Sequence, residues 1–268
     1  MENNKLENLK DYIRTLENVA VAFSGGADSA LLLKIAHDVL GENAIAITLS
    51  AKIFPQNETK ETKSFCEKEG IRHFICEFNP LQIKEFPQNS PDRCYICKKE
   101  IFSQIIKLAK ENGINNIVEG SNMDDIGDYR PGLKAIKELK VLSPLQAVGL
   151  TKAEIRILSK ELGLNTWDKP SKACLASRFA YGEEITVEKL AMVEQAEQFL
   201  ADLGYIQSRV RIHGKIARIE TLKEQIDRFV QKHKEVVCKK FKELGFLYVV
   251  LDLEGYRTGS MNEVLNKK

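Results

Sequence analysis

The sequence predicts an α/β protein, with a parallel sheet flanked by helices and a smaller C-terminal α/β domain. Short apolar runs alternate with segments of helical period from residue 18 to about 162, which is typical of a parallel sheet covered on both faces. Residues 163–184 interrupt this alternation with glycine, proline, serine and lysine. A second set of helices and strands follows in about ninety residues, which is enough for a core of its own.

The first part of the chain is expected to hold five strands and five helices. Strands are predicted at 18–23, 44–49, 71–78, 117–119 and 140–142, and helices near 29–40, 58–69, 95–112, 131–139 and 151–162. Several of the helices are followed by a glycine, such as Gly41 or Gly70, which favours a helix C-terminus there. Because ligands bind beyond the carboxyl ends of parallel strands, the loops that follow the strands are the places to look for a site.

The second part is expected to be a small α/β unit. A helix is predicted at 185–203, strands at 205–213, 215–220 and 246–252, and one long charged helix at 222–243. We therefore divide the chain into a first domain (1–165), a cysteine-bearing interdomain loop (166–184) and a small domain (185–268) for substrate binding or oligomerisation.

Composition narrows the classes of function. Lysine and arginine total 40 against 38 acidic residues, so no charge excess points to a nucleic-acid partner. The apolar runs are far shorter than the roughly 20 residues that span a bilayer. The first residues are polar and lack the apolar region of a signal peptide. These features predict a cytoplasmic protein without a membrane partner. In such a chain, Cys66, Cys76 and Cys238 are expected to be small buried apolar side chains.

The strongest local signal is the segment SGGADS, Ser24 to Ser29, which follows an apolar strand and opens a helix. Gly25 and Gly26 allow close approach of the backbone to a phosphate, and the first N–H groups of the helix lack partners. The serine hydroxyls add donors, and Asp28 beside a polyanion indicates Mg²⁺ binding or orientation of a nucleotide. A serine-capped corner between strand and helix with incidental glycines is the alternative.

The loop differs from the common phosphate-transferring loop, because it has no GxxxxGK[ST] lysine. It resembles the SGGxDS motif of the PP-loop superfamily, which has the adenine nucleotide alpha hydrolase-like fold. That superfamily includes NAD and GMP synthetases, argininosuccinate synthetase and tRNA thiolases. The resemblance implies that the protein binds ATP, adenylates its substrate and releases AMP and pyrophosphate.

Three further cysteines stand in unusual contexts. Cys94 and Cys97 form a CxxC pair at the start of a helix, and Cys174 lies in the interdomain loop. A CxxC pair alone could be a redox pair, half of a zinc site or a coincidence. No fourth cysteine or histidine stands near Cys174 in the sequence, so a closed zinc site lacks its last ligand. Three thiolates suit an iron–sulfur cluster with one open iron.

Acidic residues follow the strand predicted at 117–119. Asp124, Asp125 and Asp128 lie where metal or nucleotide contacts are expected, so Asp124 and Asp125 join Asp28 as candidate Mg²⁺ ligands. The alternative is an Asn/Asp-rich turn, in which these side chains bond the local backbone.

Six segments extend the resemblance over nearly the whole chain. In order they are SGGADS, PDRCYICKK, GSNMDDIGDYRPG, DKPSKACLASR, RVRIHGKIARIE and LDLEGYRTGSMNE. Together they resemble the LarE family, ATP-dependent sulfurtransferases that convert pyridinium-3,5-biscarboxylic acid mononucleotide, a small molecule, to its thiocarboxylate form. This is a step toward the nickel-pincer cofactor of lactate racemase. Relatives form higher oligomers, so a homo-oligomer is expected.

The resemblance also assigns roles to residues. Cys174 matches the sulfur-bearing catalytic cysteine. Family members with this cysteine alone give up their own sulfur and retain dehydroalanine, whereas members with three cysteines are thought to hold a [4Fe-4S] cluster that passes on an added sulfide. Cys94 and Cys97 place the chain in the second group, so the cofactors implied are ATP, Mg²⁺ and a [4Fe-4S] cluster.

A site for the substrate's phosphate is also implied. Arg209 and Arg211 alternate on a predicted strand and share one face, where they could bind phosphate together with Ser177 and Arg178. An exposed arginine-bearing sheet face is the alternative. Glu194 and Glu197 are expected on a solvated helix face, although one of them could orient the arginines.

Other functions remain open at this stage. A tRNA thiolase of the PP-loop and iron–sulfur type would combine the same loop with the three cysteines, but the charge is near neutral and no RNA-binding module is recognised. An amidating synthetase would need an ammonia source. A nucleotide sensor or metal-storage protein would bind ATP without releasing pyrophosphate.

Overall fold

The computed structural model describes residues 2–54, 57–126, 131–169 and 173–265. The chain forms two compact units. The first comprises Met1–Ala51, Gln56–Asn79 and Cys94–Lys172, and the second comprises Lys52–Pro55, Pro80–Arg93 and Ala173–Lys268. The second unit thus includes two short segments from the N-terminal half of the chain.

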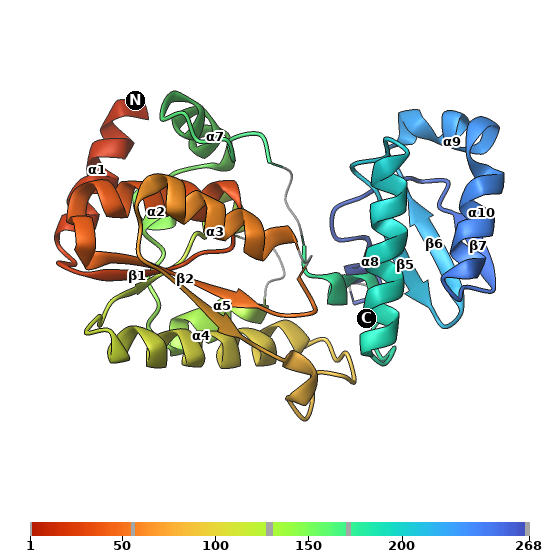
Figure 1. Cartoon of the computed structure of the whole chain (residues 1–268), viewed down its shortest axis with the longest axis horizontal. Helices are drawn as coiled ribbons and strands as arrows, with labels where there is room; N and C mark the ends of the chain where they lie inside the picture. Colours follow the sequence, from red (N-terminus) through yellow and green to blue (C-terminus); the bar gives the residue numbers. More distant parts are fainter. Residues whose placement is uncertain (1, 55–56, 127–130, 170–172, 266–268) are drawn as a thin grey trace. The chain divides into compact units, whose positions relative to one another are not determined.

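A four-stranded parallel sheet forms the centre of the first unit (Figure 1). Its strands are β1 (Val19–Ala22), β2 (Ala44–Ser50), β3 (His73–Glu77) and β4 (Ile117–Val118), in the order β3-β2-β1-β4. β1 lies between β2 and β4, so the loop that follows it starts from the middle of the sheet.

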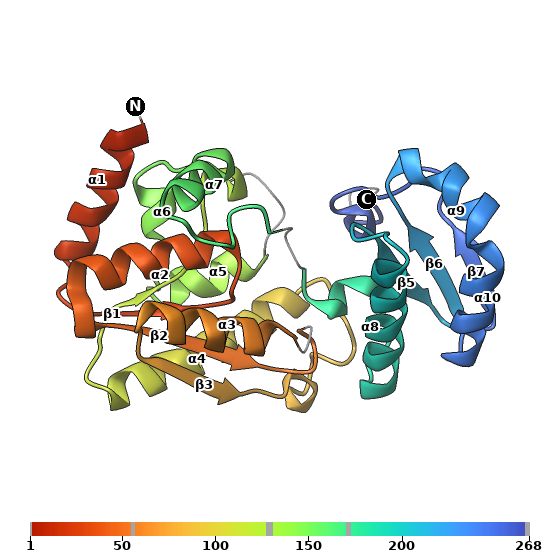
Figure 2. The ribbon, with the colours of Figure 1, turned by 45° about the horizontal axis from the view of Figure 1, so that its top comes forward.

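Helices cover both faces of this sheet (Figures 1 and 2). They are α1 (Glu2–Arg14), α2 (Ala27–Leu40), α3 (Asn57–Glu69), α4 (Arg93–Glu111), α5 (Pro131–Glu138), α6 (Pro144–Ala147) and α7 (Lys152–Glu161). Alternate residues of β1 point to opposite faces, as the pleat of a strand requires. Val21 packs into a core with α1, α2 and α7, whereas Ala20 packs into a second core with α4 and α5. The predicted fold class is confirmed for this unit.

The second unit contains a separate three-stranded mixed sheet. β5 (Arg209–His213) pairs antiparallel with β6 (Ile216–Glu220), and β6 pairs parallel with β7 (Tyr248–Leu251). The helices α8 (Val187–Asp202), α9 (Ile226–Lys232) and α10 (Lys234–Glu243) accompany the sheet. The smaller C-terminal α/β unit is therefore confirmed, while the predicted bounds at residues 165 and 184 stay a prediction.

The structure differs from the expected elements at three places. The N-terminal helix α1 was not predicted, although Leu9 and Ile13 bury one face of it in the core. The strand predicted at 140–142 is wrong, because Leu142 makes only an isolated parallel bridge to Val118. The single helix predicted at 222–243 is broken at His233, whose backbone leaves the helical region. The ring of His233 pairs with the hydroxyl of buried Tyr205, with 2.7 Å between Nδ1 and the oxygen, and this contact outweighs local helix propensity.

The cysteines outside the family segments divide into two kinds. Cys66 is buried as expected, and burial raises the pKa of its thiol to about 12. For Cys76 and Cys238 the expectation of burial is wrong, since both are half-buried. Cys76 lies on the edge strand β3, where the sheet leaves one side open.

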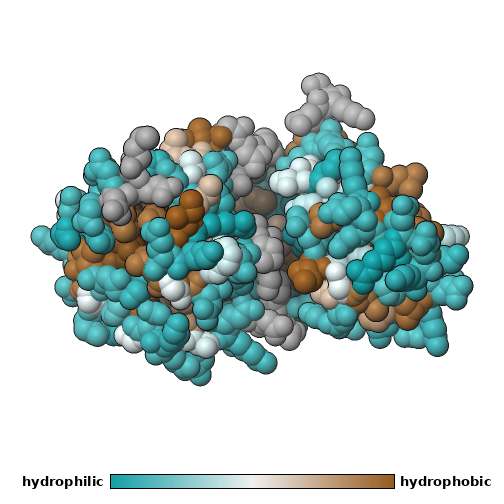
Figure 3. All heavy atoms as spheres, turned by 90° about the horizontal axis from the view of Figure 1, so that it is seen from above, coloured by the Kyte–Doolittle hydropathy of each residue, from teal (hydrophilic) through white to brown (hydrophobic). Residues whose placement is uncertain are grey.

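The visible surface of the molecule is mostly hydrophilic, with scattered apolar patches (Figure 3). Such patches are normal on water-exposed proteins. Among the described residues, no helix is long and apolar enough to cross a membrane.

Candidate functional site

The loop Ser24–Ser29 links the end of β1 to the first turn of α2. Gly25 has a left-handed backbone, with φ of +72°, and a Cβ placed there would lie 2.9 Å from Cγ2 of Thr62. Only glycine fits both constraints. Gly26 caps α2 without a side-chain hydrogen bond, so no capping side chain blocks the first N–H groups of the helix.

Ser24 and Ser29 contact each other and the loop backbone by hydrogen bonds. The Ser29 hydroxyl donates to the Gly26 carbonyl oxygen at 3.2 Å and accepts from the Ser24 backbone N–H at 3.3 Å. The two hydroxyl oxygens lie 3.1 Å apart. These neutral contacts organise the backbone without adding negative charge beside a phosphate, which is what an anion site needs.

Asp28 lies on the first turn of α2 and faces groups from two distant segments. Lys152 Nζ lies 2.5 Å from Asp28 Oδ2, and the amide of Asn122 donates to Oδ1 at 3.4 Å. Both Asp28 and Lys152 are about a quarter exposed, at 24% and 29%. Lys152 opens α7, directly after its cap Thr151, so the backbone of that helix start fixes where the ammonium group lies.

The loop after β4 brings further predicted residues to the same place. Asp124 Oδ2 accepts from the Lys152 backbone N–H at 2.9 Å. A Cβ at Gly120 would lie 3.0 Å from the Ser29 backbone nitrogen, so this loop packs directly on the loop Ser24–Ser29. We call Ser24–Ser29 the phosphate loop, after its sequence motif. Asp28 and Asp124 therefore both contact Lys152, Asp28 through the ammonium group and Asp124 through the backbone N–H.

The other predicted aspartates differ. Asp125 accepts from the Asn122 backbone N–H at 3.0 Å and forms a capping box, so the turn interpretation describes its contacts. Asp128 lies outside the described residues. Asn122 and Lys152 were not predicted, because their contacts with Asp28 span 94 and 124 residues of sequence.

The two groups of predicted cysteines belong to different units. Cys94 and Cys97 begin α4 and are exposed and buried respectively, about one helical turn apart. Cys174 is half-buried and caps the short 3-10 helix Leu175–Arg178. In the described part of the chain, no group of three or more His, Cys, Asp or Glu side chains could hold a metal ion as placed. The thiols nevertheless suit an iron–sulfur cluster by their chemistry.

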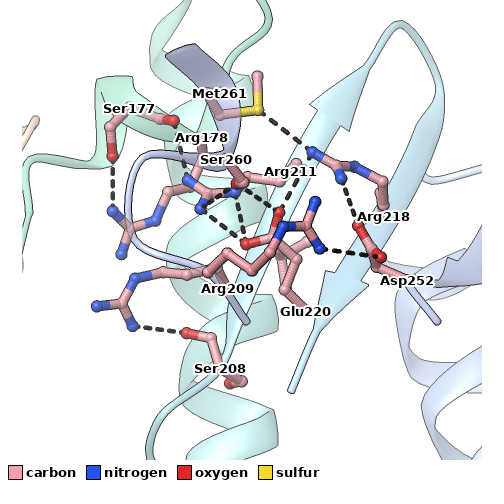
Figure 4. A network of polar contacts seen from close by, with 12 residues as sticks. Ser177, Arg178, Ser208, Arg209, Arg211, Arg218, Glu220, Asp252, Ser260 and Met261 are labelled. Atoms are coloured by element: carbon pink, nitrogen blue, oxygen red, sulfur yellow. Dashed lines mark hydrogen bonds and ion pairs between the residues drawn. The ribbon is translucent and has the colours of Figure 1, made fainter. Parts of the chain in front are cut away.

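The predicted phosphate-binding residues of the second unit lie together (Figure 4). Arg178 is 3% exposed and binds the Glu197 carboxylate through Nε and Nη2, at 2.8 and 2.9 Å. Burial alone would lower the pKa of the Arg178 guanidinium, but the Glu197 charge raises it above its ordinary value. The Arg178 Nη1 group donates to the Ser177 hydroxyl at 2.8 Å. Glu197 thus pairs with Arg178 and is only 16% exposed, while orientation of Arg209 and Arg211 by Glu197 stays a prediction.

Arg211 is buried in a second ion pair. It donates to Glu220 Oε2 through Nε and Nη2, at 3.1 and 2.7 Å, and Glu220 is fully buried. Arg218 Nη2 lies 3.2 Å from the other carboxylate oxygen, and the Ser260 hydroxyl donates to it at 2.8 Å. Figure 4 shows this network around Glu220. Arg211 also donates to the Ser177 carbonyl oxygen at 3.1 Å.

Arg209 has a different environment. Its guanidinium lies over the ring of Tyr256, with 5.2 Å from Cζ to the ring centroid, and Nη1 donates to the Ser208 carbonyl oxygen at 2.7 Å. Burial lowers the pKa of Arg209, and the nearby charge of Arg178 lowers it further. Arg178 and Arg209 thus lie near each other, and the Glu197 carboxylate compensates part of their positive charge.

Comparisons with known proteins identify the family of the chain. Residues 2–112 match the NAD synthase family. A protein of Synechocystis sp. without an assigned function is 46% identical over the whole of both chains. The pyridinium-3,5-bisthiocarboxylic acid mononucleotide synthase of Lactiplantibacillus plantarum is 39% identical over 95% of this chain and 92% of its own length. An uncharacterised Methanocaldococcus jannaschii protein is 31% identical over 94% of this chain and 95% of its own length. The chain therefore belongs to the LarE family, the family of the L. plantarum synthase, and is an enzyme of the PP-loop superfamily.

Proposed function

We propose that the protein transfers sulfur to a carboxylate of pyridinium-3,5-biscarboxylic acid mononucleotide, at the expense of ATP, in the biosynthesis of the nickel-pincer cofactor. The observation that carries this proposal is the 39% identity to the L. plantarum synthase over 95% of the chain. The organised phosphate loop independently supports the use of ATP, because such a loop suits a nucleoside triphosphate.

The chemistry has two steps. A carboxylate oxygen of the substrate attacks the α-phosphorus of ATP, so a C–O–P link forms and pyrophosphate leaves. Sulfur then attacks the acyl carbon, a C–S bond forms, and the C–O bond breaks to release AMP. Adenylation is needed because a free carboxylate is a poor electrophile and repels an anionic sulfur nucleophile.

The first unit supplies the nucleotide site in this proposal. The N–H groups at the start of α2 and the hydroxyls of Ser24 and Ser29 donate to phosphate oxygens, while Gly25 and Gly26 let them approach. Asp28, Asp124 and Asp125 are the proposed Mg²⁺ ligands, with Asp28 and Asp124 favoured by their shared contact with Lys152. Mg²⁺, when bound, supplies positive charge to the departing pyrophosphate. Lys152 then lies where it can donate to the oxygens of the departing pyrophosphate.

The second unit supplies the site for the substrate's phosphate. Ser177, Arg178, Arg209 and Arg211 are the proposed residues, supported by the proximity of Arg209 to the charges of Arg178 and Arg211 (Figure 4). Because Arg178 and Arg211 are already paired with the carboxylates of Glu197 and Glu220, we assign them mainly to positioning Ser177, which both contact. Arg209 is the proposed direct phosphate ligand.

Cys94, Cys97 and Cys174 are the proposed ligands of a [4Fe-4S] cluster, with Cys174 as the catalytic cysteine. The support is the CxxC spacing at the start of α4 together with family membership. The cluster, when bound, supplies sulfur in a form that can be renewed between turnovers. A homo-oligomeric state and a cytoplasmic location stay predictions.

Product analysis tests the adenylation proposal. With ATP, Mg²⁺ and the pyridinium mononucleotide, the protein is expected to release AMP and pyrophosphate in equal amounts. Asp28→Asn should nearly abolish this release while circular dichroism stays unchanged, because the ligand charge is lost but the loop contacts remain. ADP as the main product would refute the proposal.

Cysteine variants test the source of sulfur. After anaerobic purification, replacing Cys94, Cys97 or Cys174 by alanine should remove most of the iron and stop thiocarboxylate formation, whereas Cys238→Ala should retain both. The sacrificial route gives a different result, in which only Cys174 is essential. Intact sulfur transfer in Cys94→Ala and Cys97→Ala, with dehydroalanine at position 174 by mass spectrometry, would exclude the cluster.

A further inference from the structure

A lysine from outside the phosphate loop contacts the loop backbone. Lys169 Nζ donates to the Gly25 carbonyl oxygen at 2.8 Å, across 144 residues of sequence. The same ammonium group forms an ion pair with Glu61 of α3. SGGADS has no lysine of its own, so Lys169 adds a positive charge directly beside it.

The ion pair of Lys169 is suited to exchange. The Lys169 side chain is 19% exposed and that of Glu61 is 43% exposed, so water reaches the carboxylate. Exposed pairs of this kind contribute little to stability, which makes replacement of one anion by another easy. An ammonium group has three donors, so it can keep the Gly25 contact while it changes its charged partner.

A cavity of about 650 Å³ adjoins this contact. Gly25 and Lys169 line it, and Phe23, Phe65 and Leu164 form apolar parts of its wall. Its size lies within the usual range for small-molecule sites. Lys169 therefore stands at a place with room for a ligand beside the loop.

One polar group in the cavity wall lacks a hydrogen-bond partner among the described residues. The Thr166 side-chain oxygen is buried and has no hydrogen bond within the part of the chain that the structure describes. Thr166 also lines the cavity. Buried polar atoms are nearly always paired in the functional state, so an unpaired one indicates a missing partner.

We propose that Lys169 is a phosphate-binding residue of the nucleotide site. Without nucleotide, Glu61 holds the ammonium group; when a nucleoside triphosphate binds, a phosphate oxygen replaces the Glu61 carboxylate, and the Gly25 contact keeps the loop in place. Glu61 thereby competes with the nucleotide for Lys169. This inference rests on the proposed function only in taking ATP as the ligand.

Variants of the two partners should have opposite effects on nucleotide affinity. Lys169→Ala removes the attractive charge and should raise the Kd for nucleotide roughly tenfold or more. Glu61→Gln removes the competitor and a repulsive charge near the phosphates, so the Kd should fall several-fold. Lys63→Ala is the matched control, because Lys63 lies on the same helix α3, does not line the cavity and has a side chain that is 65% exposed.

Calorimetric titration of the full chain with Mg²⁺ and α,β-methylene-ATP measures these affinities without turnover. We expect Lys63→Ala to stay within about twofold of the wild type, as for an exposed charge outside the site. Equal Kd values for Lys169→Ala and Lys63→Ala, or weaker binding by Glu61→Gln, would overturn the inference. If Lys169→Ala does not fold, Glu61→Gln decides alone, because a folding defect cannot tighten binding.

Two results separate this inference from the proposed function. If the wild-type protein binds the analogue but the variants do not differ as stated, only the role of Lys169 is wrong. If the wild-type protein does not bind the analogue at all, the proposed function fails as well. In turnover, Lys169→Ala should raise the KM for ATP and leave the KM for the pyridinium substrate unchanged, a split that general destabilisation would not produce.

Discussion

The phosphate loop of the first unit and the arginine cluster of the second treat charge in opposite ways. Around the loop, the charged groups form partly exposed pairs, Asp28 with Lys152 and Glu61 with Lys169. In the cluster, Arg211 and Glu220 are buried and enclosed by further hydrogen bonds. Exposed pairs exchange partners at little cost, whereas separating a buried pair leaves an uncompensated charge. The first arrangement can open for a ligand, and the second holds a framework.

The largest effect should come from breaking the buried pair. Glu220→Gln leaves Arg211 and Arg218 without their shared carboxylate, so the free energy of unfolding should fall by about 3–5 kcal/mol. Urea denaturation measures this. A loss below about 1 kcal/mol would mean that the cluster is as exchangeable as the loop.

Arg209→Ala should affect stability less than Glu220→Gln does, and its main effect should be on substrate binding. Arg209→Ala should weaken binding of the pyridinium mononucleotide roughly tenfold or more, because a charge-assisted phosphate contact is lost. It should leave ATP affinity unchanged and cost no more than about 1 kcal/mol of stability. Arg211→Ala is the matched variant. We expect it to lower stability more than Arg209→Ala does and to weaken binding of the pyridinium mononucleotide less. Equal loss of both affinities in Arg209→Ala would assign this arginine to structure.

The sequence and the structure agree where local pattern determines the element. Alternating apolar runs predicted the parallel sheet, and the glycines of SGGADS predicted the loop at the end of β1. α1 was missed although Leu6, Leu9 and Ile13 have helical spacing, because its charged residues were read only for a targeting signal.

The remaining features depend on distant contacts. Lys152 and Lys169 reach the loop from more than 120 residues away, at separations of 124 and 144, and no local pattern marks them. The alternation of Arg209 and Arg211 was visible, and Glu197 was one candidate to orient the arginines. Its pairing with Arg178, and that of Glu220 with Arg211, became identifiable only once β5, β6 and α8 were assembled. Sequence spacing predicts on which side of a strand a side chain lies, but it does not predict which charged residue will lie opposite.

The smallest predicted effect concerns the support of Lys152. Lys5 binds Glu154 on the first turn of α7, and this contact together with the Thr151 backbone N–H lowers the pKa of Glu154 from 4.5 to about 2. A lowered carboxylate pKa stabilises the fold above the unfolded value and loses this effect as pH falls through the folded value.

The stability difference between wild type and Glu154→Gln should therefore be constant above about pH 5 and shrink from pH 4.5 toward pH 2. Urea denaturation at pH 7, 5, 4 and 3 follows it, with Glu161→Gln, an exposed carboxylate on α7, as control. A difference that grows on acidification would contradict the assigned pair.

Isotope transfer tests the central claim of carboxylate adenylation most directly. The pyridinium substrate is prepared with ¹⁸O in its carboxylates and incubated with the protein, ATP and Mg²⁺. The attacking carboxylate oxygen stays on the α-phosphorus when sulfur breaks the acyl C–O bond. Mass spectrometry should therefore find one ¹⁸O in AMP for each sulfur atom in the thiocarboxylate. Unlabelled AMP beside a labelled thiocarboxylate product, or ¹⁸O in inorganic phosphate with ADP as coproduct, would contradict the account.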